Sequence, residues 1–132
     1  MSRMIFINLP VKSIEQSRAF FGKLGFAFNP EFSDEHVGCM VVDDNIFVML
    51  LEEERFKDFV NGEIADAHRS TEVLTCLSAG SRAEIDQTVR TALESGGKPW
   101  KDPMDEGPMY GHSFQDLDGH VWELIYMERP TS

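Results

Sequence analysis

The arrangement of apolar and polar residues predicts a strand followed by an amphipathic helix at the start of the chain. Residues 4–11 are mostly apolar and reach a proline, Pro10, near their end, which is typical of a strand. Ser13 is a favourable helix N-cap, and Gly25 is a favourable helix end. Between these two positions the apolar residues follow helical spacing: Ile14, Ala19, Phe20, Phe21 and Leu24.

Three shorter strands are predicted after this helix, over residues 26–28, 38–42 and 46–51. Residues 43–45, with the sequence Asp-Asp-Asn, favour a tight turn between the last two strands. A short helix over residues 52–60 and a polar connector complete this half. The first half therefore has the order strand, helix and three strands.

The same order recurs in the second half of the chain. A strand over residues 73–77 precedes a helix that begins after Ser81 and ends at Gly96. Residues 98–100 predict a strand at a sheet edge, and residues 102–109 predict a loop because they contain two prolines and a glycine. Two last strands flank a turn at Asp116-Leu117-Asp118-Gly119. The predicted buried stripe of the second helix is Ile85, Val89, Ala92 and Leu93.

These elements predict an α+β fold made of two βαβββ modules. The modules span residues 1–62 and 73–132, and residues 63–72 connect them. The repeat is one of architecture, since the two halves share no clear residue-level identity.

Composition and charge exclude several classes of function. The chain has 132 residues and a formal net charge of −11, which argues against nucleic acid and anionic membrane surfaces as partners. No apolar run approaches the roughly 18 residues of a membrane span, and the N-terminus lacks the features of a signal peptide. We therefore expect a cytoplasmic protein. The acidity suits a cationic ligand, and it also suits a protein that is simply kept soluble.

Two cysteines, Cys39 and Cys76, lie in apolar runs and lack metal-like spacing. In a reducing compartment the expected state is two buried free thiols. A disulfide or a reactive thiol is the alternative.

The last predicted strand contains a carboxylate among apolar residues. Strand alternation places Glu123 on one face with Val121 and Ile125, while Trp122 and Leu124 lie on the other. A carboxylate in such surroundings needs a partner, a metal or a polar ligand. The alternative is a glutamate at a partly wet rim, paired with Lys or Arg.

Several motifs resemble the vicinal oxygen chelate superfamily, which includes glyoxalase I, bleomycin-resistance and fosfomycin-resistance proteins, and extradiol dioxygenases. The resemblance is carried by Asn8-Leu9-Pro10-Val11 with the following helix, by the helix over residues 84–97, and by residues 116–124. Residues 116–124 are similar to the family's Asp-Pro-Asp-Gly-x-x-x-Glu-Leu, with Leu117 in place of the proline. The chain looks most like the branch of predicted lactoylglutathione lyases. The resemblance implies a curved mixed sheet around a central cup, with the helices on its outer face.

The resemblance also implies where a metal would be held. In metal-using members, four ligands come from four strands, and these positions fall on Phe6, Met49, Leu74 and Glu123 of this chain. Phe, Met and Leu do not hold a hard divalent ion, and one carboxylate alone does not either. We therefore expect neither metal nor other cofactor. The alternative is a site rebuilt from His112 or His120 with Glu123.

Strand parity then gives the expected ligand-binding residues of the cup, and pairing Asp116 with His120 across the last turn places Ser113 opposite Glu123. Asp105 and Glu106 belong to a loop that could cover it. Tyr110 and His112 fall on the opposite parity, and a one-residue shift in register would bring them in. The alternative is that the cup is filled by its own side chains. The candidates are Phe6, Asn8, Met49, Leu74, Cys76, Gly111, Ser113 and Glu123, then Tyr110 and His112.

The resulting expectation is a glyoxalase- or bleomycin-resistance-like homodimer that binds a small molecule, cationic ones first, without a metal. Dimerisation is implied by the resemblance alone. One alternative is a metal-dependent lactoylglutathione lyase or dioxygenase. Another is a metal-free proton-transfer enzyme in which Glu123 is the catalytic base. The last alternative is a regulatory protein with a vestigial pocket.

Overall fold

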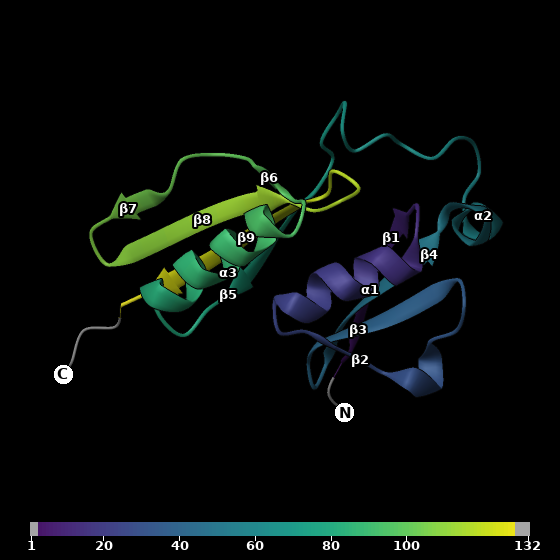
Figure 1. Cartoon of the computed structure of the whole chain (residues 1–132), viewed down its shortest axis with the longest axis horizontal. Coiled ribbons are helices and arrows are strands. Elements are labelled where there is room, and N and C mark those ends of the chain that lie inside the picture. Colours follow the sequence, from purple (N-terminus) through teal and green to yellow (C-terminus); the bar gives the residue numbers. More distant parts are fainter. Residues whose placement is uncertain (1–2, 129–132) are drawn as a thin grey trace. The chain divides into compact units, whose positions relative to one another are not determined.

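A computed structural model describes residues 3–128 and shows the predicted α+β fold (Figure 1). The chain divides into two compact units, the first up to Ala65 and the second from Asp66. Hydrogen bonding arranges the strands into a four-stranded sheet in the first unit and a five-stranded sheet in the second. No helix between residues 3 and 128 is long and apolar enough to cross a membrane.

The sheet of the first unit has the strand order β1-β4-β3-β2. Strand β1 runs parallel to β4, and the other neighbours are antiparallel. Two short helices, α2 and the 3₁₀ helix η2, follow the last strand. The elements are β1 (Ile5–Val11), α1 (Ile14–Lys23), β2 (Ala27–Phe28), η1 (Pro30–Phe32), β3 (Val37–Asp43), β4 (Ile46–Glu52), α2 (Glu53–Phe56) and η2 (Lys57–Phe59).

Local sequence explains where α1 begins and which face it buries. The Ser13 hydroxyl accepts a hydrogen bond from the Gln16 N–H at 3.2 Å, as its role as N-cap predicts. The helix buries Phe20 and Phe21 with Ile14 and Ser17. Ala19 is exposed, so its predicted place in the stripe is wrong. It lies about 140° around the helix from Ile14, whereas Ser17 lies beside it.

The core of the first unit lies between α1 and one face of its sheet. Met40 and Val48 are registered neighbours with no exposed surface. Gly38, two residues before Met40, lies on the same face beneath α1. A Cβ atom at Gly38 would approach Ile14 Cδ1 to 2.6 Å. The helix therefore packs directly on backbone at this point.

The second unit repeats this topology, with the order β5-β9-β8-β6 and the short β7 added against β8. Strand β5 runs parallel to β9, as β1 does to β4. Strand β7 lies inside the segment predicted to be a loop; that prediction is wrong for residues 104–106, which pair with β8. The elements are β5 (Leu74–Ser78), α3 (Arg82–Glu94), β6 (Lys98–Pro99), β7 (Met104–Glu106), β8 (Met109–Gln115) and β9 (Val121–Met127).

Helix α3 packs on β8 and β9 and begins at the predicted cap. The Ser81 hydroxyl accepts a hydrogen bond from the Glu84 N–H at 3.1 Å. Ile85, Val89 and Ala92 are buried as predicted. Leu93 is 39% exposed, so its predicted burial is wrong. It lies about 80° around the helix from Ile85, outside the buried stripe.

Candidate functional site

The second unit contains a cavity of about 250 Å³ on the sheet face that does not carry α3. Its floor is formed by residues of β5, β9 and β8, and one wall is formed by the segment between β6 and β8. We call residues 101–106 the wall segment. The cavity is lined by Cys76, Lys101, Asp102, Met104, Gly111, His112, Ser113, Glu123, Leu124 and Ile125.

Three polar side chains form a row across the floor. Glu123 on the central strand β9 is registered with Cys76 of β5 on one side and with Ser113 of β8 on the other. The predicted pairing of Ser113 with Glu123 is therefore confirmed. Directly opposed residues in a sheet have Cβ atoms about 5 Å apart, so one small ligand group can reach all three side chains.

The Glu123 carboxylate is available to a ligand. Glu123 is partly buried, yet it forms no hydrogen bond or ion pair with any residue in the described range 3–128. Ser113 is 5% exposed, and its hydroxyl likewise has no hydrogen-bonding partner within that range. Partly buried polar groups are normally hydrogen-bonded, so this pair is best satisfied by water or by a ligand.

The two cysteines differ, contrary to the expectation that both are buried. Cys39 is buried, while Cys76 is exposed at the cavity floor, and both are free thiols. Neighbouring atoms still enclose the Cys76 sulfur enough that desolvation raises its pKa, and the charge of Glu123 raises that pKa further. Cys76 is therefore a protonated thiol near neutral pH, suited to hydrogen bonding more than to nucleophilic attack.

Tyr110 and His112 point differently from the floor residues. The Tyr110 hydroxyl donates a hydrogen bond to Asp86 of α3, and Tyr110 does not line the cavity. His112 borders the cavity, and its Nδ1 atom is buried with no hydrogen-bonding partner among the described residues.

The predicted residues of the first unit occupy one face of its sheet. Phe6 stacks on its registered neighbour Phe47, with ring centroids 5.0 Å apart. Asn8 is registered with Met49, and Met49 with Cys39. In the second unit, Leu74 pairs with Val121 and does not line the cavity.

The two units place corresponding residues in corresponding rows. Asn8 precedes the N-cap Ser13 by 13 − 8 = 5 positions, and Cys76 precedes the N-cap Ser81 by 81 − 76 = 5 positions. The row Asn8, Met49 and Cys39 therefore corresponds to the row Cys76, Glu123 and Ser113. Met49 stands where the second unit has its carboxylate, so only the second row is acidic.

The residues at the implied metal positions do not fit a divalent ion. The Phe6 ring and the Leu74 side chain contain no donor atom, and the Met49 thioether is a soft ligand. Residues 3–128 contain no group of three or more His, Cys, Asp or Glu side chains placed to hold a metal. Glu123 is thus the one hard donor of the four positions.

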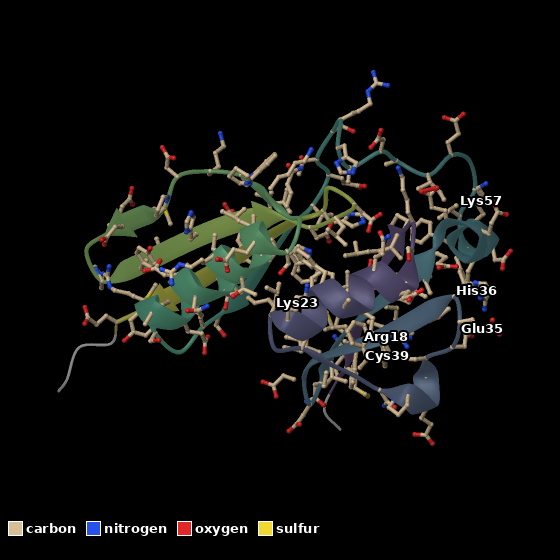
Figure 2. The ribbon with its side chains drawn as sticks, viewed as in Figure 1. Arg18, Lys23, Glu35, His36, Cys39 and Lys57 are labelled. Carbon is tan, nitrogen blue, oxygen red and sulfur yellow. The ribbon has the colours of Figure 1, made fainter. Side chains whose placement is uncertain are left out.

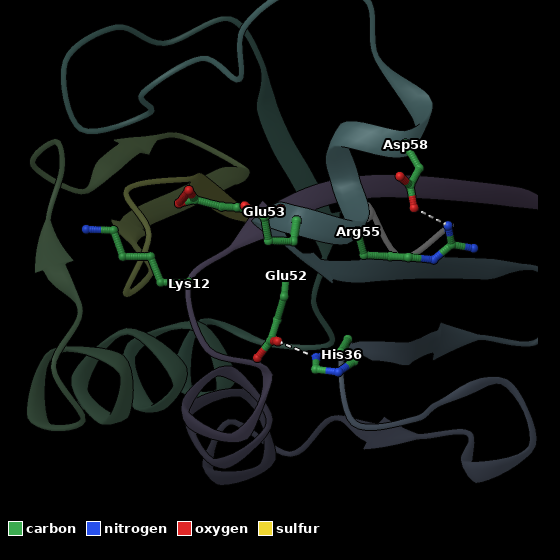
Figure 3. A pocket seen from close by; sticks show the side chains of 7 residues that line it. Lys12, His36, Glu52, Glu53, Arg55 and Asp58 are labelled. Atoms are coloured by element: carbon green, nitrogen blue, oxygen red, sulfur yellow. Dashed lines mark hydrogen bonds and ion pairs between the residues drawn. The ribbon is translucent and has the colours of Figure 1, made fainter.

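A larger hollow of about 590 Å³ lies in the first unit, at the end of β4 (Figure 3). Its charged groups largely neutralise one another. Glu52 Oε2 accepts a hydrogen bond from the Ile14 N–H at 3.0 Å, and Glu52 Oε1 lies 2.7 Å from Nδ1 of His36, which directly precedes β3 (Figure 2). Arg55 binds Asp58 at 2.7 Å. We therefore place the candidate site in the second unit.

Part of the cavity lining was not predicted from the sequence. The polar floor residues were predicted from strand parity, but Lys101 and Met104 were not. The nearest signal was the loop predicted over residues 102–109, which could cover the cup, but its sequence does not indicate which of its side chains face the cavity.

A family model and several solved structures are similar to this chain. Residues 3–43 match the model described as bleomycin resistance protein-like N-terminal. These residues contain β1, α1, β2 and β3. No curated protein sequence matches the chain.

The fold is shared with proteins from several bacteria. A hypothetical protein from S. aureus has a TM-score of 0.80 and 28% identity, covering 96% of this chain and 95% of its own. A glyoxalase/bleomycin resistance protein/dioxygenase family enzyme from Burkholderia phytofirmans has a TM-score of 0.77 and 14% identity, covering 96% and 99%. A genomically encoded fosfomycin resistance protein from Listeria monocytogenes has a TM-score of 0.68 and 16% identity, covering 96% and 93%.

Proposed function

We propose that the protein binds a small molecule in the cavity of its second unit, and that Glu123 orients a cationic or hydrogen-bond-donating group of that molecule. The observation that carries this proposal is the Glu123 carboxylate on the cavity floor, which forms no hydrogen bond or ion pair with any of residues 3–128. Met104, Leu124 and Ile125 supply the apolar part of the lining around it. Small-molecule sites typically combine apolar walls with a few orienting polar groups. Ser113 and the Cys76 thiol supply two further hydrogen-bonding groups beside it.

The charge of the protein supports a cationic ligand. Its net charge of −11 favours the approach of cations over anions. The cavity lining contains two acidic side chains, Glu123 and Asp102, and one lysine, Lys101. Acidic side chains therefore outnumber lysine in the lining.

Binding of a flat aromatic cation, thioflavin T, tests this proposal by its fluorescence at low ionic strength. The anionic dye 8-anilinonaphthalene-1-sulfonate serves for comparison. We expect micromolar binding of thioflavin T, and Glu123→Gln should weaken it on the order of tenfold, because a charged hydrogen bond is lost.

The control variant is Glu94→Gln, which makes the same charge change at an exposed position of α3 outside the cavity. It should leave the affinity for thioflavin T nearly unchanged. Equal weakening by both variants, or no binding of thioflavin T at micromolar concentration, would reject the proposed site.

A second candidate function is metal-free proton transfer with Glu123 as the base. It is favoured by Lys101, which lines the same cavity without forming an ion pair with Glu123. Glu123 would take a proton from a carbon beside a carbonyl, and the Lys101 ammonium would lie near the enolate oxygen. Deuterium incorporation into dihydroxyacetone in D₂O, followed by proton NMR, tests this. Exchange that Glu123→Gln leaves unaltered would exclude it.

We further propose that the chain is a bleomycin-resistance-like member of the vicinal oxygen chelate superfamily that acts in the cytoplasm as a homodimer without a metal. The match of residues 3–43 and the shared fold support the family. Elemental analysis of untreated protein, with thermal unfolding after addition of Ni²⁺, Zn²⁺ or Mn²⁺, tests whether the protein binds a metal. Stoichiometric metal with a large rise in Tm would instead favour a metal-dependent lyase or dioxygenase.

A further inference from the structure

The wall segment of the cavity is held to the sheet only in part. Strand β6 pairs with β8 at Phe114 and Gln115, and β7 pairs with β8 from Met109 to Gly111. Residues 100–103 lie between β6 and β7 and pair with no strand in the described part of the chain. The position of the wall therefore depends on what holds β7.

Helix α3 holds β7 from the other side of the sheet. Arg82 Nη1 lies 3.0 Å from Asp105 Oδ1, and Arg82 Nη2 donates a hydrogen bond to the Gly107 carbonyl at 3.1 Å. The guanidinium carbon of Arg82 lies 5.0 Å from the centre of the Tyr110 ring. Tyr110 also donates a hydrogen bond to Asp86, one turn further along α3. Arg82 and Asp86 of α3 thus bond to both strands of the β7–β8 hairpin or to the turn between them.

Strand alternation links the contact between Arg82 and Asp105 to the cavity. Successive side chains of a strand point to opposite faces, so Asp105 points toward α3 when Met104 points toward the cavity. Met104 lines the cavity and lies over Gly111, where a Cβ atom would be 3.7 Å from the Met104 methyl carbon. A contact that fixes Asp105 therefore also fixes where Met104 closes the cavity.

We infer that Arg82 is a positioning residue of the cavity: it sets how closely Met104 and the wall segment cover the floor, and so which size of ligand fits. This inference rests on the proposed function, because it takes the cavity as the ligand site. Arg82 itself lines no part of the cavity. A mutation there changes access and selectivity without removing any group that a ligand touches.

Cys76 provides a test that needs no ligand. It lies on the cavity floor, while Cys39 is buried in the other unit. The experiment measures how fast Cys76 reacts with a small reagent, methyl methanethiosulfonate, and with a bulky one, N-(1-pyrenyl)maleimide. The ratio of the bulky to the small reagent rate reports how open the cavity is between the wall segment and the floor. Arg82→Met keeps the apolar stem over Tyr110 and removes the charge and the hydrogen bonds.

We expect Arg82→Met to raise the ratio of bulky to small reagent rates roughly fivefold, the effect of losing a part-exposed ion pair and one hydrogen bond. Asp105→Asn, at an exposed position of the wall itself, should raise it less, because the Gly107 contact remains. Arg90 is an exposed arginine of the same helix that forms no hydrogen bond or ion pair with a described residue, so Arg90→Met is the matched control.

An unchanged ratio in Arg82→Met and Asp105→Asn would overturn the role of Arg82, and so would an equal change in Arg90→Met. Neither result depends on dye binding. Failure of thioflavin T to bind, with a raised ratio in Arg82→Met, would instead reject the proposed function alone.

Discussion

The indole Nε1 of Trp122 donates a hydrogen bond to Asp116 Oδ2 at 2.9 Å, inside the hairpin that carries Glu123. Asp116 is 3% exposed, and its Oδ1 accepts hydrogen bonds from the backbone N–H groups of Asp118 and His120 at 2.9 and 3.0 Å. One buried carboxylate therefore fixes both the turn between β8 and β9 and the first residues of β9. Its burial raises the pKa of Asp116, while the charge of His120 and the hydrogen bonds from Trp122 and the Asp118 N–H act in the opposite direction.

Asp116→Asn should destabilise the protein by about 1–3 kcal/mol, the cost of leaving a buried donor unsatisfied. An asparagine amide group facing Trp122 cannot accept the indole hydrogen bond that the carboxylate accepts. Urea unfolding followed by tryptophan fluorescence measures the loss. Asp44→Asn, at an exposed turn position of the first unit, should change the unfolding free energy by less than about 0.5 kcal/mol. Equal midpoints for the two variants would contradict the role of Asp116.

Gly38→Ala should destabilise the first unit by about 1–3 kcal/mol, because the added methyl group would overlap Ile14 and crowd Phe28. Replacing Ile14 by Val removes the Cδ1 atom involved, so Ile14→Val should recover part of the loss in the double variant. Gly22→Ala is the control: it has nothing within 4 Å of the new atom and lies inside α1. It should stabilise by about 0.5–1 kcal/mol. Additive effects of Gly38→Ala and Ile14→Val would show that the close approach is absent.

Glu123→Gln should lower the pKa of Cys76. The main cause that raises this pKa is desolvation, which the substitution leaves in place, but the charge of Glu123 also raises it and is removed. The rate of Cys76 alkylation by iodoacetamide should therefore rise in the variant between pH 7 and 9 (roughly the range of thiol titration). Cys76→Ser supplies the background rate. An identical pH profile for wild type and Glu123→Gln would mean that the two side chains are not neighbours.

The contact between His36 and Glu52 should make stability depend on pH. The hydrogen bond from His36 to Glu52 is the largest cause that raises the pKa of His36 above 6.5, with smaller contributions from the charges of Glu52, Glu35 and Asp34. The hydrogen bond from the Ile14 N–H, followed by that from His36, lowers the pKa of Glu52 below 4.5. The stabilisation from the raised pKa of His36 is fully present below pH 6.5 and is lost as the pH rises through the pKa of His36 in the folded protein. The stabilisation from the lowered pKa of Glu52 is fully present above pH 4.5 and is lost as the pH falls through the pKa of Glu52 in the folded protein.

The contribution of the pair is therefore greatest between pH 4.5 and 6.5. The difference in Tm between wild type and His36→Gln, measured from acid to mildly alkaline pH, should be largest in this window and should shrink in high salt, because the His36 side chain is 65% exposed. A difference in Tm that does not vary with pH would rule out an ion pair at this position.

Features set by local chemistry were predicted from the sequence, and features set by distant packing were not. Ser13 and Ser81 cap helices as predicted, because capping needs only residues three positions away. The burial of Ala19 and Leu93 was predicted wrongly, because the width of a buried stripe depends on what packs against the helix. Strand β7 was missed because its pairing with β8, and not its own sequence, makes it a strand.

The two-module architecture and the row that contains Glu123 and Ser113 could be predicted from the sequence, since strand alternation and a short turn fix which side chains share a face. The sequence does not indicate that Lys101 and Met104 line the cavity, or that Arg82 contacts the wall segment from the opposite side of the sheet. It also did not predict that Cys76 is exposed. Those relationships join residues far apart in the chain, and only tertiary packing brings such residues within the few ångströms over which hydrogen bonds and side-chain contacts act.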